Sequence, residues 1–376
     1  MGNNPLLGIK SLGQSIWLDY IERGMLARGE IARLIENDGL AGITSNPTIF
    51  EKAISGHKDY DAAIAALARR DASVKEMYEA LVLEDVGTAA DLLLPVYKQT
   101  KGRDGFVSIE VSPHLANDTR LTVKEGRRLW DNLRRPNVMI KVPATIEGLP
   151  AIRQLIADDI NVNVTLLFGL GRYREVVQAY MSGLEDRVAA GKPLESIASV
   201  ASFFLSRIDV LVDRQMDRLA DSGADKSVSV LRGQAAIACA RLAYQTYKEL
   251  VSGERWRKLA VRGARTQRLL WASTGTKDPG YSDVKYVDPL IGPDTVNTLP
   301  PETLEAYRDH GQPALRLEQE LALASELPAR LSQHGIDLES VALQLETEGV
   351  KKFVEPFDKL LSSLERRRRQ SVAAGT

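Results

Sequence analysis

Eight short apolar segments, most of them followed by a helical pattern, constrain the fold of this chain more than any other feature. Strands that alternate with helices pair in parallel, and eight such units predict a closed (β/α)8 barrel, the TIM barrel. An open doubly wound sheet is the alternative, but it uses a glycine-rich loop after its first strand, and no GxGxxG lies there. The expected strands are Ser15–Tyr20, Leu40–Ser45, Gly105–Val111, Val138–Thr145, Ile160–Phe168, Ala198–Leu205, Arg268–Ser273 and Val284–Val287.

Helices are expected where apolar side chains recur every three or four residues between these strands. Pro95 is expected to interrupt the helical region from Ala72 to Lys101, because proline removes a backbone donor. The other expected helices include Tyr60–Leu67, Val123–Arg134, Tyr173–Met181 and Ala235–Val251.

The length of 376 residues fits two average domains or one barrel with added helices. We predict a single TIM-barrel domain over residues 1–376, with additional helices and a helical extension from about 300 to 376. The basic run Arg366–Arg369 lies near the end of that extension. A solvated helix end or tail is expected there, and an anion or RNA site is the alternative.

Composition indicates a cytoplasmic protein. The net charge of −1 gives no general attraction to nucleic acid or to acidic membranes. Met1–Lys10 lacks the apolar core of a signal peptide, and no apolar stretch reaches the ~20 residues that cross a bilayer. The single cysteine, Cys239, excludes an internal disulfide and suits a reducing compartment.

Lys141 lies in the middle of the apolar run Val138–Thr145, which is typical of a strand buried on both faces. Burial of an ammonium is costly, so the site favours the neutral amine, the form that attacks carbonyls. We therefore expect Lys141 to form a Schiff base with a carbonyl substrate. The alternative is a strand-end lysine that reaches water or pairs with a carboxylate.

Polar residues occupy the ends of several expected strands, where apolar residues would be cheaper to bury. In a barrel the carboxyl ends of the strands meet at one mouth, which is where active sites lie. Each buried polar group needs a partner, so their convergence indicates a site. The residues are Asp19, Asn46, Glu110, Lys141, Asn163, Thr165 and Ser202.

Two of these segments resemble the signatures of a known family. Gly42–Phe50 resembles the first transaldolase signature. Ile140–Leu149, followed by Val162–Phe168, resembles the second, which contains the Schiff-base lysine of these class I aldolases. The length and the segment Leu270–Lys277 resemble the longer bacterial subtype.

The resemblance implies an enzyme of the pentose phosphate pathway. Such enzymes move a dihydroxyacetone unit from sedoheptulose 7-phosphate or fructose 6-phosphate to glyceraldehyde 3-phosphate or erythrose 4-phosphate. They use no cofactor and no metal, and the dispersed histidines His57, His114, His310 and His334 show no ligand spacing. Sugar phosphates are the expected partners, and a monomer or homodimer is the expected assembly.

By this resemblance Lys141 attacks the ketose, and Asp19 is the general base for the C4 hydroxyl. Glu110 and Thr165 hold a catalytic water, with the carboxylate as acceptor and the hydroxyl as donor. The alternatives from the residues alone are an ion pair for Asp19, a barrel salt bridge for Glu110 and a plain strand former for Thr165.

Asn46 and Asn163 are expected to bind substrate hydroxyls and to retain the three-carbon enamine. The alternatives are a turn residue for Asn46 and a hydrogen bond inside the barrel for Asn163. Ser202, Phe204 and Arg207 match a family motif on the sixth strand. There Ser202 contacts substrate, Phe204 limits water and Arg207 binds phosphate.

The second phosphate-binding cation departs from the pattern of the shorter family members, which place an arginine after the seventh strand. Lys277 is the cation available there. Arg265 and Arg268 are alternatives, but they lie before or at the start of that strand, at the wrong end of a barrel.

Two other functions compete with transfer. One is an aldolase that releases dihydroxyacetone, but fructose-6-phosphate aldolases of the superfamily tend to have tyrosine where Phe204 stands. The other is a barrel that has lost catalysis and serves as a scaffold. The presence of Asp19, Glu110 and Lys141 argues against it.

Overall fold

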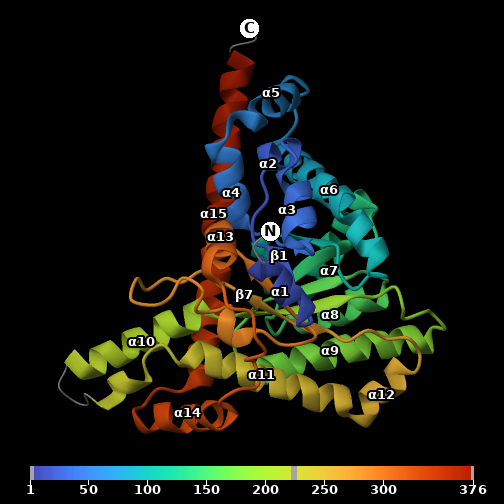
Figure 1. The fold of residues 1–376 in the computed structure, drawn as a ribbon. Coiled ribbons are helices and arrows are strands. Elements are labelled where there is room, and N and C mark those ends of the chain that lie inside the picture. The colour runs from blue at the N-terminus through green and yellow to red at the C-terminus, as the bar shows by residue number, and fades with distance from the viewer. Residues whose placement is uncertain (1–3, 222–226, 374–376) are drawn as a thin grey trace.

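The computed structural model describes residues 4–221 and 227–373 as a closed barrel of eight parallel strands, each paired with its neighbours in chain order (Figure 1). The TIM barrel predicted from the sequence is therefore confirmed. The strands are β1 (Gln14–Leu18), β2 (Gly42–Ile43), β3 (Phe106–Glu110), β4 (Val138–Pro143), β5 (Val162–Leu167), β6 (Ser199–Phe204), β7 (Arg268–Ala272) and β8 (Thr295–Leu299).

The prediction for the eighth strand is wrong. Val284–Val287 forms turns, and the strand that closes the barrel against β1 is Thr295–Leu299. Val284, Tyr286 and Val287 are buried and β-branched or aromatic, but those properties favour strands only weakly. The true strand was hidden because Thr295 and Asn297 alternate with its apolar residues, although both are fully buried.

Local signals explain where several helices begin. Asn46 caps α4 through a hydrogen bond from the Ile49 amide, and Pro47 occupies the first helical position. Ser73 and Glu76 form a capping box at the start of α6. The α-helices are α1 (Pro5–Ser11), α2 (Arg23–Ala27), α3 (Glu30–Asp38), α4 (Pro47–Gly56), α5 (Asp61–Arg69), α6 (Val74–Gln99), α7 (Thr119–Leu133), α8 (Gly148–Ala157), α9 (Leu170–Ala189), α10 (Ser206–Asp221), α11 (Ala235–Ser252), α12 (Glu254–Ala260), α13 (Pro301–His310), α14 (Leu321–Gln333) and α15 (Leu338–Ala373).

Pro95 does not interrupt the helix in which it lies, contrary to the prediction. It lies inside the continuous helix α6. A proline deprives the carbonyl four residues earlier of its helical partner, here that of Asp91. Both Pro95 and Asp91 are exposed, so water can satisfy that carbonyl. Short 3-10 helices complete the secondary structure as η1 (Lys58–Tyr60), η2 (Pro113–Leu115), η3 (Ser227–Leu231) and η4 (Asp288–Leu290).

The C-terminal extension is confirmed and consists of α13, α14 and α15. The last helix is long, runs along the molecule beside α4 and α5, and also contacts α6, α10 and β5 (Figure 1). The basic run Arg366–Arg369 lies near the end of this helix, as expected for a helix end, and Arg366 and Arg369 are exposed. Arg367 donates to the Ile54 carbonyl at 2.9 Å and pairs with Asp61.

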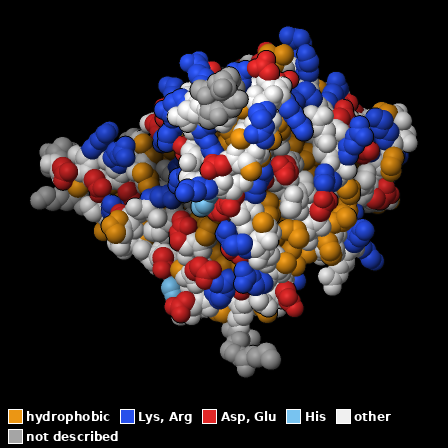
Figure 2. Space-filling view, turned by 90° about the horizontal axis from the view of Figure 1, so that it is seen from above, with side chains coloured by type: hydrophobic (Ala, Val, Ile, Leu, Met, Phe, Trp, Pro, Cys, Tyr) orange, Lys and Arg blue, Asp and Glu red, His pale blue; other side chains and the backbone are white. Residues whose placement is uncertain are grey.

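The described surface carries charges of both signs. Figure 2 shows basic and acidic side chains interspersed over the face seen from above. Among the described residues, no helix is both long enough and apolar enough to cross a membrane.

Candidate active site

The strand ends open into a pocket of about 340 Å³ at the barrel mouth. It collects residues from β4, β6, β7 and β8, from the segments after β1, β2, β7 and β8, and from α4, α10, α13 and α15. Three predicted site residues, Glu110, Asn163 and Thr165, are buried in the adjoining strands and do not line it. The predicted residues that line the pocket are Asp19, Asn46, Lys141, Ser202, Phe204, Arg207 and Lys277.

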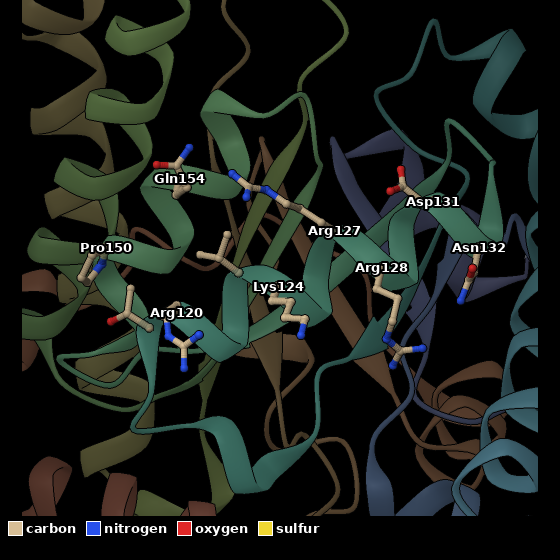
Figure 3. Close-up of a pocket in the computed structure, with 10 residues that line it drawn as sticks. Arg120, Lys124, Arg127, Arg128, Asp131, Asn132, Pro150 and Gln154 are labelled. Carbon is tan, nitrogen blue, oxygen red and sulfur yellow. The ribbon is translucent and has the colours of Figure 1, made fainter.

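A larger but shallow groove of about 800 Å³ lies elsewhere, between α7 and α8 (Figure 3). Arg120, Lys124, Arg127 and Arg128 make it basic. It shares no residue with the pocket at the strand ends, and two of its four cations already bind carboxylates, Arg127 that of Asp158 and Arg128 that of a glutamate on α6. Convergent polar groups at the carboxyl ends of barrel strands therefore identify the smaller pocket as the candidate site.

Lys141 lies on β4 and is only 4% exposed, so its side chain does not extend out to bulk water. Its Nζ atom donates to the Ser45 carbonyl at 2.9 Å. The same atom lies 3.6 Å from Glu110 Oε2, an ion-pair distance that is too long for a hydrogen bond. The structure thus places a buried amine, with a carboxylate beside it, in the wall of a pocket.

Glu110 stands directly opposite Lys141 in the β3–β4 pairing. Burial raises the pKa of Glu110 from its ordinary value of 4.5 to about 7, and the charge of Lys141 opposes that rise. Neither carboxylate oxygen has a hydrogen-bond partner among the described residues, and the buried Thr165 hydroxyl has none either. Since β3 and β5 flank β4, these groups stand on either side of Lys141.

Asp19 follows β1 at the mouth and accepts a 2.7 Å hydrogen bond from the Thr44 hydroxyl. Desolvation raises the pKa of this carboxyl, whereas Lys141, Thr44 and Lys277 act in the opposite direction. Thr44 is in turn 2.7 Å from the Thr298 hydroxyl, which fixes its orientation. Sequence reasoning missed Thr44, although it lies inside the first family signature.

Asn163 takes part in a hydrogen-bonded row across three strands. Ser202 donates to its Oδ1 at 2.7 Å, and its Nδ2 donates to the Ser108 hydroxyl at 3.0 Å. The geometry therefore agrees with the alternative of a bond inside the barrel. Asn46 also caps α4, and among the described residues it does so only through Oδ1, so its Nδ2 is available at the pocket.

Arg207 is the main cation deep in the pocket. Its guanidinium carbon lies 5.4 Å from the ring centre of Phe204 and 5.8 Å from that of Phe353. Its buried Nη1 has no hydrogen-bond partner in the part of the chain that the structure describes. Desolvation lowers the pKa of Arg207, but a guanidinium is so strong a base that it stays charged.

The alternatives to Lys277 lie at the opposite end of the barrel. Arg268 begins β7, donates to Ser15 and pairs with Asp104 at 2.8 Å. Arg265 donates to carbonyls of the segment that precedes β3. Lys277 lines the pocket, as does Lys52 of α4, a cation that sequence reasoning did not single out.

In the described part of the chain, one group of side chains outside the pocket could hold a metal ion. Carboxylate or imidazole atoms of Glu22, His57 and Asp59 lie within 4.8 Å of one another, and His57 and Asp59 are exposed. Arg28 already lies 3.7 Å from Glu22 and competes for it. The spacing of the histidines along the chain did not indicate this cluster.

Fold and site together define a class. A closed (β/α)8 barrel with a buried amine, two carboxylates with raised pKa values and several cations at the strand ends has the arrangement of a barrel enzyme.

Comparisons with known proteins make the class specific. Residues 16–364 match the model of the family described as transaldolase/fructose-6-phosphate aldolase. A protein named Transaldolase 2 from a Nostoc species is 50% identical over 372 residues, which cover 97% of this chain and 98% of that protein. Proteins named Transaldolase from Thiobacillus denitrificans and Mycobacterium tuberculosis are 49% and 45% identical, and each alignment covers at least 95% of both chains.

The chain belongs to the transaldolase/fructose-6-phosphate aldolase family, and it is a transferase of the transaldolase type.

Proposed function

We propose that the protein transfers a dihydroxyacetone unit from a ketose phosphate to an aldose phosphate through a Schiff base on Lys141. The observation that carries the proposal is the position of this amine, buried at the barrel mouth, 3.6 Å from Glu110 and in a pocket shared with Asp19. Sedoheptulose 7-phosphate and fructose 6-phosphate are the proposed donors. Glyceraldehyde 3-phosphate and erythrose 4-phosphate are the proposed acceptors.

The first step is attack of Lys141 Nζ on the C2 carbonyl, followed by loss of water to give an iminium. This step moves protons onto and off oxygen. Glu110 suits that task because its pKa of about 7 lets it give and take a proton near neutral pH. The Glu110 carboxylate and the Thr165 hydroxyl, both buried with unused hydrogen-bonding capacity, suit a shared water.

The second step is cleavage of the C3–C4 bond. Asp19 removes the proton of the C4 hydroxyl while the bond electrons enter the iminium, which becomes an enamine. The hydrogen bond from Thr44 aims the Asp19 carboxylate and favours its ionised form. The aldehyde leaves, an acceptor aldehyde enters, and the same groups act in reverse.

Retention of the three-carbon enamine separates transfer from simple cleavage. The Nδ2 group of Asn46 is available for a substrate hydroxyl. Ser202 also lines the pocket. Its hydrogen bond to Asn163 holds in place the row of buried polar side chains behind the pocket wall. Phe204 forms an apolar wall against Phe168, with ring centres 5.2 Å apart.

Arg207 and Lys277 are the proposed phosphate ligands. A guanidinium offers paired donors that match phosphate oxygens, and Arg207 Nη1 is a buried donor without a partner among the described residues. Lys277 adds a second positive charge from the segment after β7. We also propose that the barrel and its extension act as one catalytic domain over residues 1–376, since α15 supplies part of the pocket wall. The proposed location of the enzyme is the cytoplasm.

A transfer assay tests this function. Fructose 6-phosphate is supplied with or without erythrose 4-phosphate, and glyceraldehyde 3-phosphate is measured continuously. Transfer predicts sustained product only when the acceptor is present. Sustained product without acceptor, together with free dihydroxyacetone, would show an aldolase instead.

A further inference from the structure

The helix α15 contributes a side chain to the pocket from more than two hundred residues beyond Lys141. Phe353 lines the pocket and is only 3% exposed, although it comes from the C-terminal extension and not from a strand end. Neither family signature contains it. The pocket therefore has an apolar wall from the barrel, Phe204, and a second one from the extension, Phe353.

Phe353 is also in contact with the main cation of the site. The Arg207 guanidinium lies 5.8 Å from the ring centre of Phe353 and 5.4 Å from that of Phe204, so it is held against two aromatic rings. One turn earlier in α15, Gly349 lets the helix come close to the barrel, because a β-carbon there would lie 3.0 Å from Leu166. The position of the ring is thus set by tight packing.

Ion pairs fix α15 over this position. Lys359 pairs with Glu51 of α4 at 2.7 Å. Farther along, Arg367 donates to the Ile54 carbonyl at 2.9 Å, and Arg368 pairs with Asp71 at 2.6 Å. The first two contacts hold the helix against α4, whose first residues follow Asn46 at the pocket, and the third joins it to the segment between α5 and α6. The basic run of the extension is therefore part of what positions Phe353.

We propose that Phe353 determines the balance between transfer and hydrolysis by excluding water from the enamine and by holding Arg207 against the substrate phosphate. This inference rests on the proposed Schiff-base function. Phe353 would shield the three-carbon intermediate, and the reactant that it would keep out is water.

The competing reaction is a defined sequence of bonds. The nucleophilic carbon of the enamine takes a proton from water instead of forming a carbon–carbon bond with the acceptor aldehyde. The resulting iminium adds one water molecule and expels the amine. The net change consumes one water, frees Lys141 and releases dihydroxyacetone. Walls that keep water out slow this sequence without touching the reacting atoms.

The test compares Phe353→Ala with a matched control, Phe357→Ala. Phe357 lies one turn later in the same helix and is similarly buried, but it packs on Tyr78 and His114, with ring centres 5.2 Å and 5.8 Å away. The measured quantity is free dihydroxyacetone released per transfer event, with fructose 6-phosphate as donor and erythrose 4-phosphate as acceptor. The KM for the donor is measured alongside.

We expect Phe353→Ala to raise this ratio several-fold and to raise the KM, while Phe357→Ala leaves the ratio at the level of the unaltered protein. Phe353→Leu keeps an apolar group in place and should give an intermediate ratio, which preserves the test if the alanine variant folds poorly. Equal ratios in Phe353→Ala, Phe353→Leu and the unaltered protein would overturn the inference. So would an equal rise in Phe357→Ala. The function itself is judged separately, on whether the unaltered protein transfers at all.

Discussion

Glu110→Gln should make the fold more resistant to alkaline conditions while it impairs catalysis. Burial raises the pKa of Glu110 from 4.5 to about 7, so the folded state binds a proton that the unfolded state has released between these two values. Stability contributed by this group is therefore full below pH 4.5 and is lost as the pH rises through 7. Glutamine mimics the protonated form and cannot titrate.

The size of the effect follows from the same values. A separation from 4.5 to about 7 corresponds to about 3 kcal/mol, because each pKa unit is about 1.4 kcal/mol. Part of that loss has already occurred at pH 5. The free energy of unfolding of Glu110→Gln, minus that of the unaltered protein, should therefore grow by about 2–3 kcal/mol between pH 5 and pH 8.

Urea denaturation at several pH values measures this difference directly. Glu254→Gln is the control, since Glu254 is exposed and its pKa is lowered from the ordinary 4.5 in the folded state, so most of its titration lies below this range. The free energy of unfolding of Glu254→Gln, minus that of the unaltered protein, should stay nearly constant with pH. Turnover of Glu110→Gln should fall by about 100-fold or more, the usual scale for loss of a proton-transfer group. A Glu110→Gln curve parallel to that of the unaltered protein would refute the burial argument.

Three further outcomes are expected. Asp19→Asn should still form the Schiff base but lose turnover by about 10²–10⁴-fold, measured by borohydride trapping beside steady-state rates, and near-normal turnover would show that Asp19 is not the base. Lys277→Met should raise the KM for sugar phosphates with little change in stability, whereas unchanged KM would remove Lys277 from the phosphate site. Arg268→Met should lower the free energy of unfolding by about 3 kcal/mol because it leaves Asp104 buried without its cation, and the KM of the folded fraction should not change. A raised KM with normal stability would instead place Arg268 in the site.

The barrel could be predicted because its information is local. Seven strands can be recognised in the sequence as apolar runs, and the order of strands and helices then limits the topology. The eighth strand could not be found this way, since Thr295 and Asn297 lower its apolar content although both are buried. Their side chains donate to carbonyls of the segment before β8, those of Gly292 and Tyr286. The continuous helix through Pro95 could not be predicted either. The free-energy cost of a proline inside a helix depends on whether the carbonyl that loses its partner reaches water.

The candidate site was predictable where polarity conflicts with a buried strand, as it does at Lys141 and Glu110. The hydrogen-bond partners were not, because they depend on which strands become neighbours in space. Thr44 beside Asp19 is one example. Phe353 is the extreme case, since an aromatic residue in an amphipathic helix is ordinarily core, and only the path of α15 across the barrel brings it to the pocket.

Borohydride trapping tests the central claim most directly. The protein is incubated with fructose 6-phosphate, reduced and digested, and the lysine peptides are examined by mass spectrometry. A three-carbon adduct on Lys141, absent from a Lys141→Met variant, is the predicted result. A folded protein with no adduct would contradict the claim, as would an adduct on Lys52 or Lys277, the other lysines that line the pocket.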